Sequence, residues 1–151
     1  MPTRKQLRAA RACRCVRDRQ EQMHETASKA YGRLCLRLPF LLRSSGLCQT
    51  LAFFDAKAKL GTKKEKVEYV AAIEDLATVI GVDMPTLRRR AFEDGVGAYC
   101  HLIRDAMEAS GFLKRYAEAI LRVDPTEDTE IVPEAEAGPT AQDAGAKNEH
   151  A

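Results

Sequence analysis

Three basic side chains lie four residues apart in the sequence: Lys29, Arg33 and Arg37. Residues at this spacing are neighbours along one side of a helix, where like charges repel by about 0.2–0.5 kcal/mol per pair. An anion laid along the row would relieve that repulsion. The spacing therefore predicts either a row of contacts to successive phosphates of a nucleic acid, with Arg43 nearby, or a basic face that only meets water.

A second basic cluster, Arg88, Arg89 and Arg90, opens an alternative. The stretch from Leu76 to Arg90 places a small residue, a turn glycine and a basic segment in the order of a helix-turn-helix. Such a motif would direct the arginines into the major groove of DNA. A DNA-binding regulator is therefore the alternative function, although any amphipathic helix pair with a glycine turn gives a similar pattern.

No residues are spaced as a catalytic or metal-binding set. The three histidines have no nucleophile motif beside them, and there is no glycine-rich phosphate loop. Cys13 and Cys15 with His24 lack a fourth ligand at zinc-site spacing. The five cysteines, an odd number, form no disulfide framework, so we expect reduced thiols. We predict a protein that is not an enzyme and holds no metal or cofactor.

The net charge of +2 conceals a strong segregation along the chain. Residues 1–43 carry 11 Lys or Arg against 3 Asp or Glu, residues 44–123 carry 12 against 11, and residues 124–151 carry 1 against 8. A basic body with an acidic tail points to a polyanionic partner, most commonly nucleic acid. The tail, rich in Pro, Ala and acids, has too little apolar surface to offset its ordering entropy, so we expect disorder. It either competes with nucleic acid for basic residues or is merely solvated.

The elements that must carry these residues are all expected to be helices. Apolar residues recur at spacings of three and four residues, and apolar and polar residues never alternate strictly, as they would in a strand. We predict an all-α fold, a compact bundle of about five or six helices in one domain over 1–123, followed by the tail 124–151. No apolar run is long enough to span a bilayer, so a soluble, cytoplasmic protein is expected. The helices are expected at about 3–22, 27–43 with a kink at Pro39, 47–60, 63–80, 85–94, and 97–122 with a possible kink at Gly111.

Two separated blocks carry a family resemblance. The first, Leu38 to Phe53, reads LPFLLRSSGLCQTLAF, and the second, Gly111 to Leu121, reads GFLKRYAEAIL. Both resemble the small subunit of the type III-B (Cmr) CRISPR RNA-guided effector complex, in the family's order, and the resemblance covers about residues 1–123. Phe112 stands where the family often has Trp, and neither the tail nor Arg88–Arg90 has a counterpart.

The resemblance implies a non-catalytic helical subunit that stacks with copies of itself into an inner filament, beside the backbone and large subunits. It also implies contact with the crRNA and the target RNA that pairs with it. A protein that touches phosphates and leaves base pairing to read sequence suits a basic helical body. Phe40 and Leu36 lie off the main apolar stripe of their helix and are candidates for subunit contacts. The candidate RNA-binding residues are Lys29, Arg33, Arg37, Arg43, Lys57, Lys114 and Arg115.

Overall fold

The computed structural model describes residues 1–59 and 66–127, and within them the chain forms five α-helices and no strand. The all-α bundle predicted from the sequence is confirmed. The junction near residues 60–65 lies outside the described residues. So does the tail, for which we expected disorder, apart from its first four residues, 124–127. The helices are α1 Arg4–Gln22, α2 Glu25–Lys59, α3 Val67–Ile80, α4 Met84–Glu93 and α5 Val96–Tyr116, followed by a π-helical turn, η1 Ala117–Leu121, and a 3-10 turn, η2 Pro125–Glu127.

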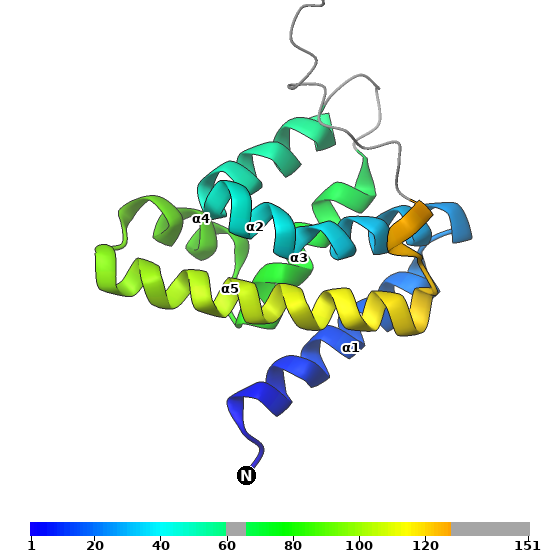
Figure 1. Cartoon of the computed structure of the whole chain (residues 1–151), viewed down its shortest axis with the longest axis horizontal. Coiled ribbons are helices and arrows are strands. Elements are labelled where there is room, and N and C mark those ends of the chain that lie inside the picture. The colour runs from blue at the N-terminus through cyan, green and yellow to red at the C-terminus, as the bar shows by residue number, and fades with distance from the viewer. Residues whose placement is uncertain (60–65, 128–151) are drawn as a thin grey trace, which may run out of the picture.

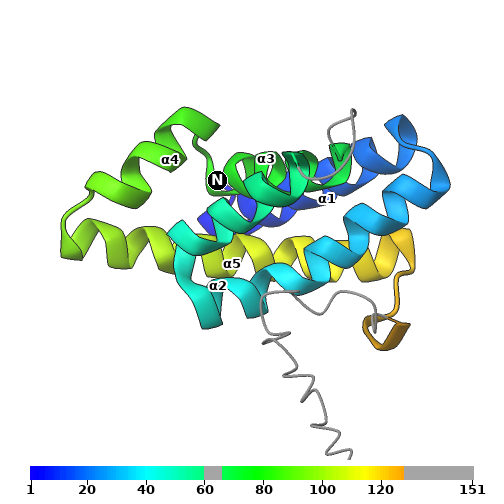
Figure 2. The same cartoon turned by 90° about the horizontal axis from the view of Figure 1, so that it is seen from above.

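The long helices α2 and α5 form the centre of the bundle. The first part of α2 and most of α5 run side by side in opposite directions, and the first turns of α5 extend past α2 towards α4 (Figure 1). α3 packs against α2, and α1 crosses α5 and also contacts α3 (Figures 1 and 2). α2 therefore has neighbours on two sides and keeps an outer ridge for solvent.

Local capping chemistry fixes several helix ends. Thr3 begins α1 with a capping box, in which its hydroxyl accepts from the backbone N–H of Gln6 and the Gln6 side chain accepts from the N–H of Thr3. Gly81 ends α3 in the left-handed conformation, with φ 100°, which a residue without a Cβ adopts most readily. Asp83 begins α4 by accepting from the N–H of Thr86, just before Pro85 in the first turn.

α2 changes direction at Gly46, where φ is 76° and ψ is 173°. This backbone conformation is essentially restricted to glycine, so Gly46 divides α2 into a segment 25–45 and a segment 47–59. The break lies where the sequence predicted an interruption between two helices. Pro39 lies inside the first segment, and Gly46 alone departs from helical dihedral angles within Glu25–Lys59. The last helix, by contrast, runs through Gly111 unbroken and changes only at the π-helical turn.

The core is a single apolar cluster to which every α-helix contributes, and Tyr31, Leu34, Leu38 and Phe54 are its large members from α2. The sequence offered Leu36, with Phe40, as a candidate for subunit contacts, and for Leu36 this was wrong. Leu36 is buried, because α2 packs against both α3 and α5 and its apolar face is wide. Phe40 is exposed as expected, at 66%. No helix in the described ranges is both long and apolar enough to cross a membrane.

Candidate nucleic-acid interface

A buried polar network fixes the segment of α2 that carries the basic row. Asp75 of α3, 4% exposed, accepts a 2.6 Å hydrogen bond from the Tyr31 hydroxyl of α2. Both Asp75 oxygens accept from the Arg19 guanidinium of α1, at 2.9 and 3.1 Å, and Glu74 accepts a longer 3.3 Å bond from the same group. Three helices thus meet at one carboxylate, which sets the rotation of α2 about its axis.

The groups around Asp75 are unsuited to proton transfer near neutral pH. Burial raises the pKa of Cys15 to about 12 and also raises the pKa values of Cys35 and Tyr31. The hydrogen bond to Asp75 raises the pKa of Arg19, which therefore stays charged. Thiols held protonated are poor nucleophiles, and the network serves to position α2.

Opposite Tyr31, α2 presents the three cations of the predicted row, which we call the α2 ridge: Lys29, Arg33 and Arg37. All three are partly exposed. One flank of the ridge is closed by the chain after α5, since a Cβ placed on Gly32 would stand 3.0 Å from methyl groups of Leu121 and Val123. The other flank faces α3 across a small hollow lined by Arg33 and Tyr69.

The ridge cations differ in their partners. Lys29 and Arg33 form no ion pair or side-chain hydrogen bond within residues 1–59 and 66–127. Arg37 has an interaction partner of its own. Glu68 lines the same hollow as Arg33 without pairing with it. Lys29 and Arg33 are therefore available to an external anion.

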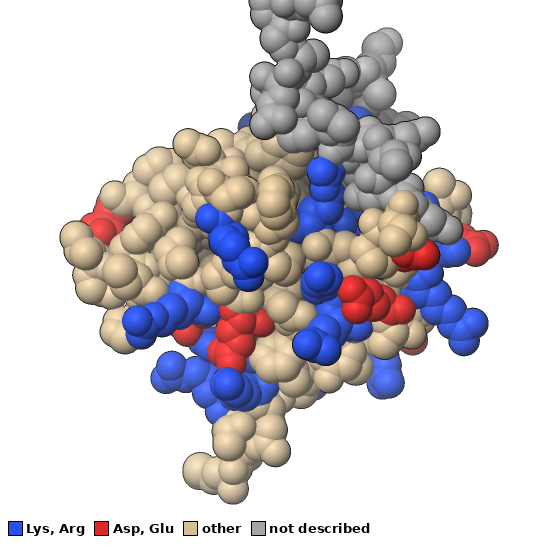
Figure 3. All heavy atoms as spheres, in the orientation of Figure 1, with Lys and Arg blue, Asp and Glu red and all other residues tan. Residues whose placement is uncertain are grey.

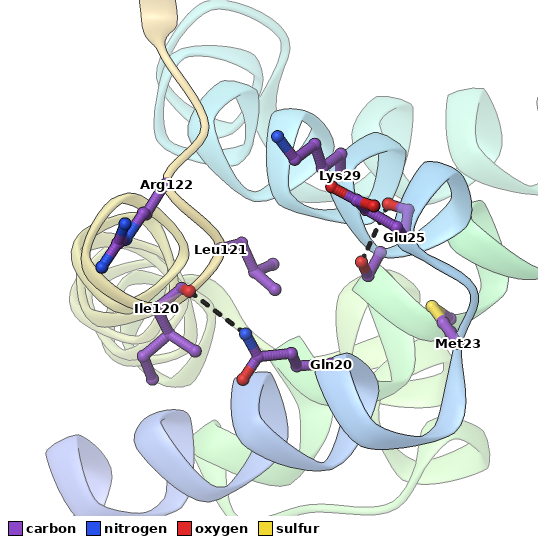
Figure 4. A pocket seen from close by; sticks show the side chains of 8 residues that line it. Gln20, Met23, Glu25, Lys29, Ile120, Leu121 and Arg122 are labelled. Atoms are coloured by element: carbon purple, nitrogen blue, oxygen red, sulfur yellow. Dashed lines mark hydrogen bonds between the residues drawn. The ribbon is translucent and has the colours of Figure 1, made fainter.

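A hollow of about 580 Å³ lies beside Lys29, between α1, α2 and the end of η1. Figure 4 shows Lys29 and Arg122 on two of its walls, with Leu121 between them, and Gln20 donates a 3.3 Å hydrogen bond to the carbonyl of Ile120. Arg122 has φ 53°, a left-handed conformation that turns the chain back towards α2. Sequence reasoning missed Arg122 because it lines the same hollow as Lys29 from a position 93 residues away, for which the sequence holds no local signal.

The other predicted RNA-binding residues are spread over the molecule. Arg43 is exposed two turns beyond the ridge, on the same segment of α2. Lys57 lies beyond the Gly46 break, with its amino group 5.8 Å from the centre of the Phe53 ring. Lys114 and Arg115 lie in the last turn of α5, at the end of the bundle where α2 begins (Figure 1). The structure thus groups Lys114 and Arg115 with the ridge more closely than it groups Lys57.

The Arg88–Arg90 cluster is mostly occupied by internal partners. Arg88 makes a two-pronged ion pair with Asp55 of α2, one bond of which is 2.7 Å, and Arg90 pairs with Asp94 at 2.9 Å. Arg89 alone of the three is exposed without such a partner in the described chain. A recognition helix needs several outward side chains, so α4 is poorly equipped for reading a DNA groove.

Some basic side chains elsewhere in the chain also form internal ion pairs. Arg8 of α1 is 5% exposed and bonds Asp105 at 2.9 Å and Glu108 at 2.5 Å on α5. Figure 3 shows Lys and Arg distributed over the face that α5 crosses, with acids among them, rather than gathered into one patch. The charge available to a polyanion is therefore smaller than the count of basic residues.

No group of three or more His, Cys, Asp or Glu side chains is placed to hold a metal ion in residues 1–59 and 66–127. His24 lies between α1 and α2, whereas His101 lies on α5. Both are exposed, and Cys100 is an exposed thiol. The arrangement on α2 suits one kind of chemistry, the electrostatic binding of a linear polyanion.

Comparison with known proteins gives a consistent answer. The model of a family described as CRISPR-associated protein (Cas_Cmr5) matches residues 4–120. The CRISPR system Cmr subunit Cmr5 of Thermus thermophilus is 35% identical over 127 residues, covering 80% of this chain and 98% of the relative. The crystal structure of a CRISPR-associated Cmr5 family protein from the same organism superimposes with a TM-score of 0.67 at 33% identity, covering 79% of this chain and 97% of that chain. The chain belongs to the Cmr5 family of CRISPR-associated proteins.

Proposed function

We propose that this protein is a non-catalytic structural subunit of a Cmr CRISPR ribonucleoprotein and that its α2 ridge contacts the sugar-phosphate backbone of the crRNA or of the target RNA. The observation that carries the proposal is the exposure of Lys29 and Arg33 on a rigidly positioned helix without a carboxylate partner in the described chain. Contacts of this kind add affinity and orientation without reading sequence.

Arg43, Lys114 and Arg115 extend the proposed contact. Lys114 and Arg115 lie in the last turn of α5, and Arg43 lies further along the segment of α2 that carries the ridge. Lys57 is the weakest member of the predicted set, because its amino group already lies over the Phe53 ring. The helix-turn-helix alternative has no comparable support, because two of its three arginines are paired internally.

The same proposal includes stacking with copies of the chain and contact with the backbone and large subunits. Phe40 is the candidate protein contact on α2, since an aromatic side chain 66% exposed beside a charged ridge favours burial against another protein. Native mass spectrometry of the assembled complex should find more than one copy of the chain. A complex with a single copy would contradict stacking.

RNA crosslinking tests the contact. A complex reconstituted with its partner subunits and photoreactive crRNA or target RNA should yield crosslinked peptides from 25–43 and from the end of α5. The peptide holding Arg88–Arg90 is the internal control and should be nearly free of crosslinks. Crosslinks concentrated in α4, with none on α2, would contradict the proposal.

A further inference from the structure

The acidic charge of this chain is concentrated immediately after the folded body. Residues 124–136 contain six carboxylates and no Lys or Arg: Asp124, Glu127, Asp128, Glu130, Glu134 and Glu136. The family match ends at residue 120, and 98% of the Thermus relative is covered by 80% of this chain. The acidic segment therefore lies outside the matched body, and the family comparison assigns it no role.

The described chain passes beside the α2 ridge just before this segment begins. Val123, which is buried, packs against Gly32, one position before Arg33 and three after Lys29. Arg122 makes the left-handed turn that brings the chain there, and the Asp124 side chain accepts 2.7 Å bonds from the backbone N–H and the hydroxyl of Thr126. Val123 thus stands next to the part of α2 that carries Lys29 and Arg33.

The dimensions and charges are compatible. The ridge from Lys29 to Arg37 is eight residues long, or roughly 12 Å at 1.5 Å per residue. Residues 128–136 could extend to about 30 Å at about 3.3 Å per residue. Tethering beside the ridge would give the segment an effective concentration on the order of millimolar. Carboxylates can therefore reach every ridge cation without moving the body.

We propose that residues 128–136 occupy the α2 ridge as an internal polyanion and that RNA phosphates must displace them. Exposed ion pairs are individually weak, because water and salt screen them. The segment therefore competes effectively with free RNA that makes only a few contacts to this chain. RNA that the other subunits of the complex also bind displaces it. The contact between tail and ridge stands by itself, whereas the competition with RNA rests on the proposed function.

Carbodiimide crosslinking of the full chain, without RNA, tests the contact directly, because this reagent joins an amine to a carboxylate in contact with it. At low salt, Lys29 should be joined to acids within 128–136, and 0.5 M salt should abolish the product. Lys5 and Lys57 are exposed or partly exposed controls that should not give it. Tail acids that join all lysines alike, or none, overturn the proposal.

RNA binding tests the consequence. Neutralising the segment in the full chain, with Asp128→Asn, Glu130→Gln, Glu134→Gln and Glu136→Gln, should tighten low-salt binding of a 20-nucleotide RNA about tenfold. Neutralising Asp143 and Glu149 instead is the matched control and should change it less than twofold. Adding Lys29→Ala and Arg33→Ala to the neutralised chain should remove the gain.

The two proposals fail differently. If Lys29 joins the tail but RNA binding is indifferent to Lys29 and Arg33, the tail contact stands and the ridge is not an RNA contact. If Lys29→Ala and Arg33→Ala weaken RNA binding while the crosslink is absent and neutralisation changes nothing, the ridge keeps its function and the internal polyanion is refuted.

Discussion

Two sets of cations on neighbouring helices of this protein differ in whether the fold pairs them with carboxylates. Arg8 and Arg19 of α1 are bound to carboxylates of α5 and α3 at 2.5–3.3 Å, whereas Lys29 and Arg33 of α2 have no such partner in the described chain. Both sets look alike in sequence, as basic residues on amphipathic helices. A cation that the fold has already paired with a carboxylate is less available to an external anion, so only the second set is a candidate for the proposed RNA contact.

The largest effect on stability should come from removing Asp75, the carboxylate that pairs with Arg19 of the first set. Asp75→Ala leaves the buried Tyr31 hydroxyl without its acceptor and Arg19 without its two-pronged partner. We expect urea unfolding to show a loss of about 3 kcal/mol. Glu74→Ala is the control, because Glu74 is half-exposed and should cost at most about 1 kcal/mol. Equal losses would mean that Asp75 is not the anchor of α2.

The second effect concerns Arg8. Arg8→Met keeps much of the buried side-chain volume but leaves Asp105 and Glu108 without their guanidinium, and charged hydrogen bonds of this kind contribute about 2 kcal/mol. Thermal and urea unfolding should both report the loss. Arg4→Met, at an exposed position on the same helix, should change stability by less than about 0.5 kcal/mol. If Arg8→Met leaves the free energy of unfolding unchanged, the ion pairs of Arg8 do not stabilise the fold.

Alkaline pH should weaken the same buried network. The folded-state pKa values of Cys15, Cys35 and Tyr31 are raised, so the folded chain binds more protons than the unfolded chain above the ordinary thiol range. Stability is therefore full below about pH 9 and falls as pH rises towards 12, by up to about 1.4 kcal/mol per pH unit for each group. Urea midpoints between pH 8 and 10.5 measure this, and Cys35→Ala should flatten the decline. A pH-independent midpoint would contradict the burial of these groups.

The smallest effect on stability is expected from the ridge. Lys29→Ala with Arg33→Ala removes no internal bond and two like-charge repulsions, Lys29 with Arg33 and Arg33 with Arg37, and Ala favours helix. The free energy of unfolding should stay within about 0.5 kcal/mol of the unmodified chain. A loss above about 1 kcal/mol would show that Lys29 and Arg33 stabilise the fold, as Arg8 and Arg19 are expected to do.

The sequence was sufficient for features set by local chemistry. Helix ends at Thr3, Gly81 and Asp83 follow from capping residues within a few positions, and Gly46 marked the break in α2. The spacing of Lys29 and Arg33 likewise gave the ridge, since neighbours on one helix face are fixed by the helical repeat.

Features that depend on distant partners could not be predicted. Arg8 is buried only because Asp105 and Glu108 come from a helix about 100 residues later, and Leu36 is buried because two helices pack on α2. The occupation of Arg88 by Asp55 is of the same kind. A pattern on one helix shows which residues share a face, but the neighbouring helices decide whether that face meets solvent.

The most direct test of the account is the salt dependence of target-RNA binding by the assembled complex. With Lys29→Ala and Arg33→Ala in the subunit, affinity should fall for every guide sequence alike, and the slope of log affinity against log salt should flatten by about 0.7–0.9 for each lost phosphate contact. Arg89→Ala with Arg104→Ala, two exposed cations away from the ridge, is the matched control and should leave the slope unchanged. A complex that assembles with the ridge variant and keeps both affinity and slope would show that the α2 ridge meets only water.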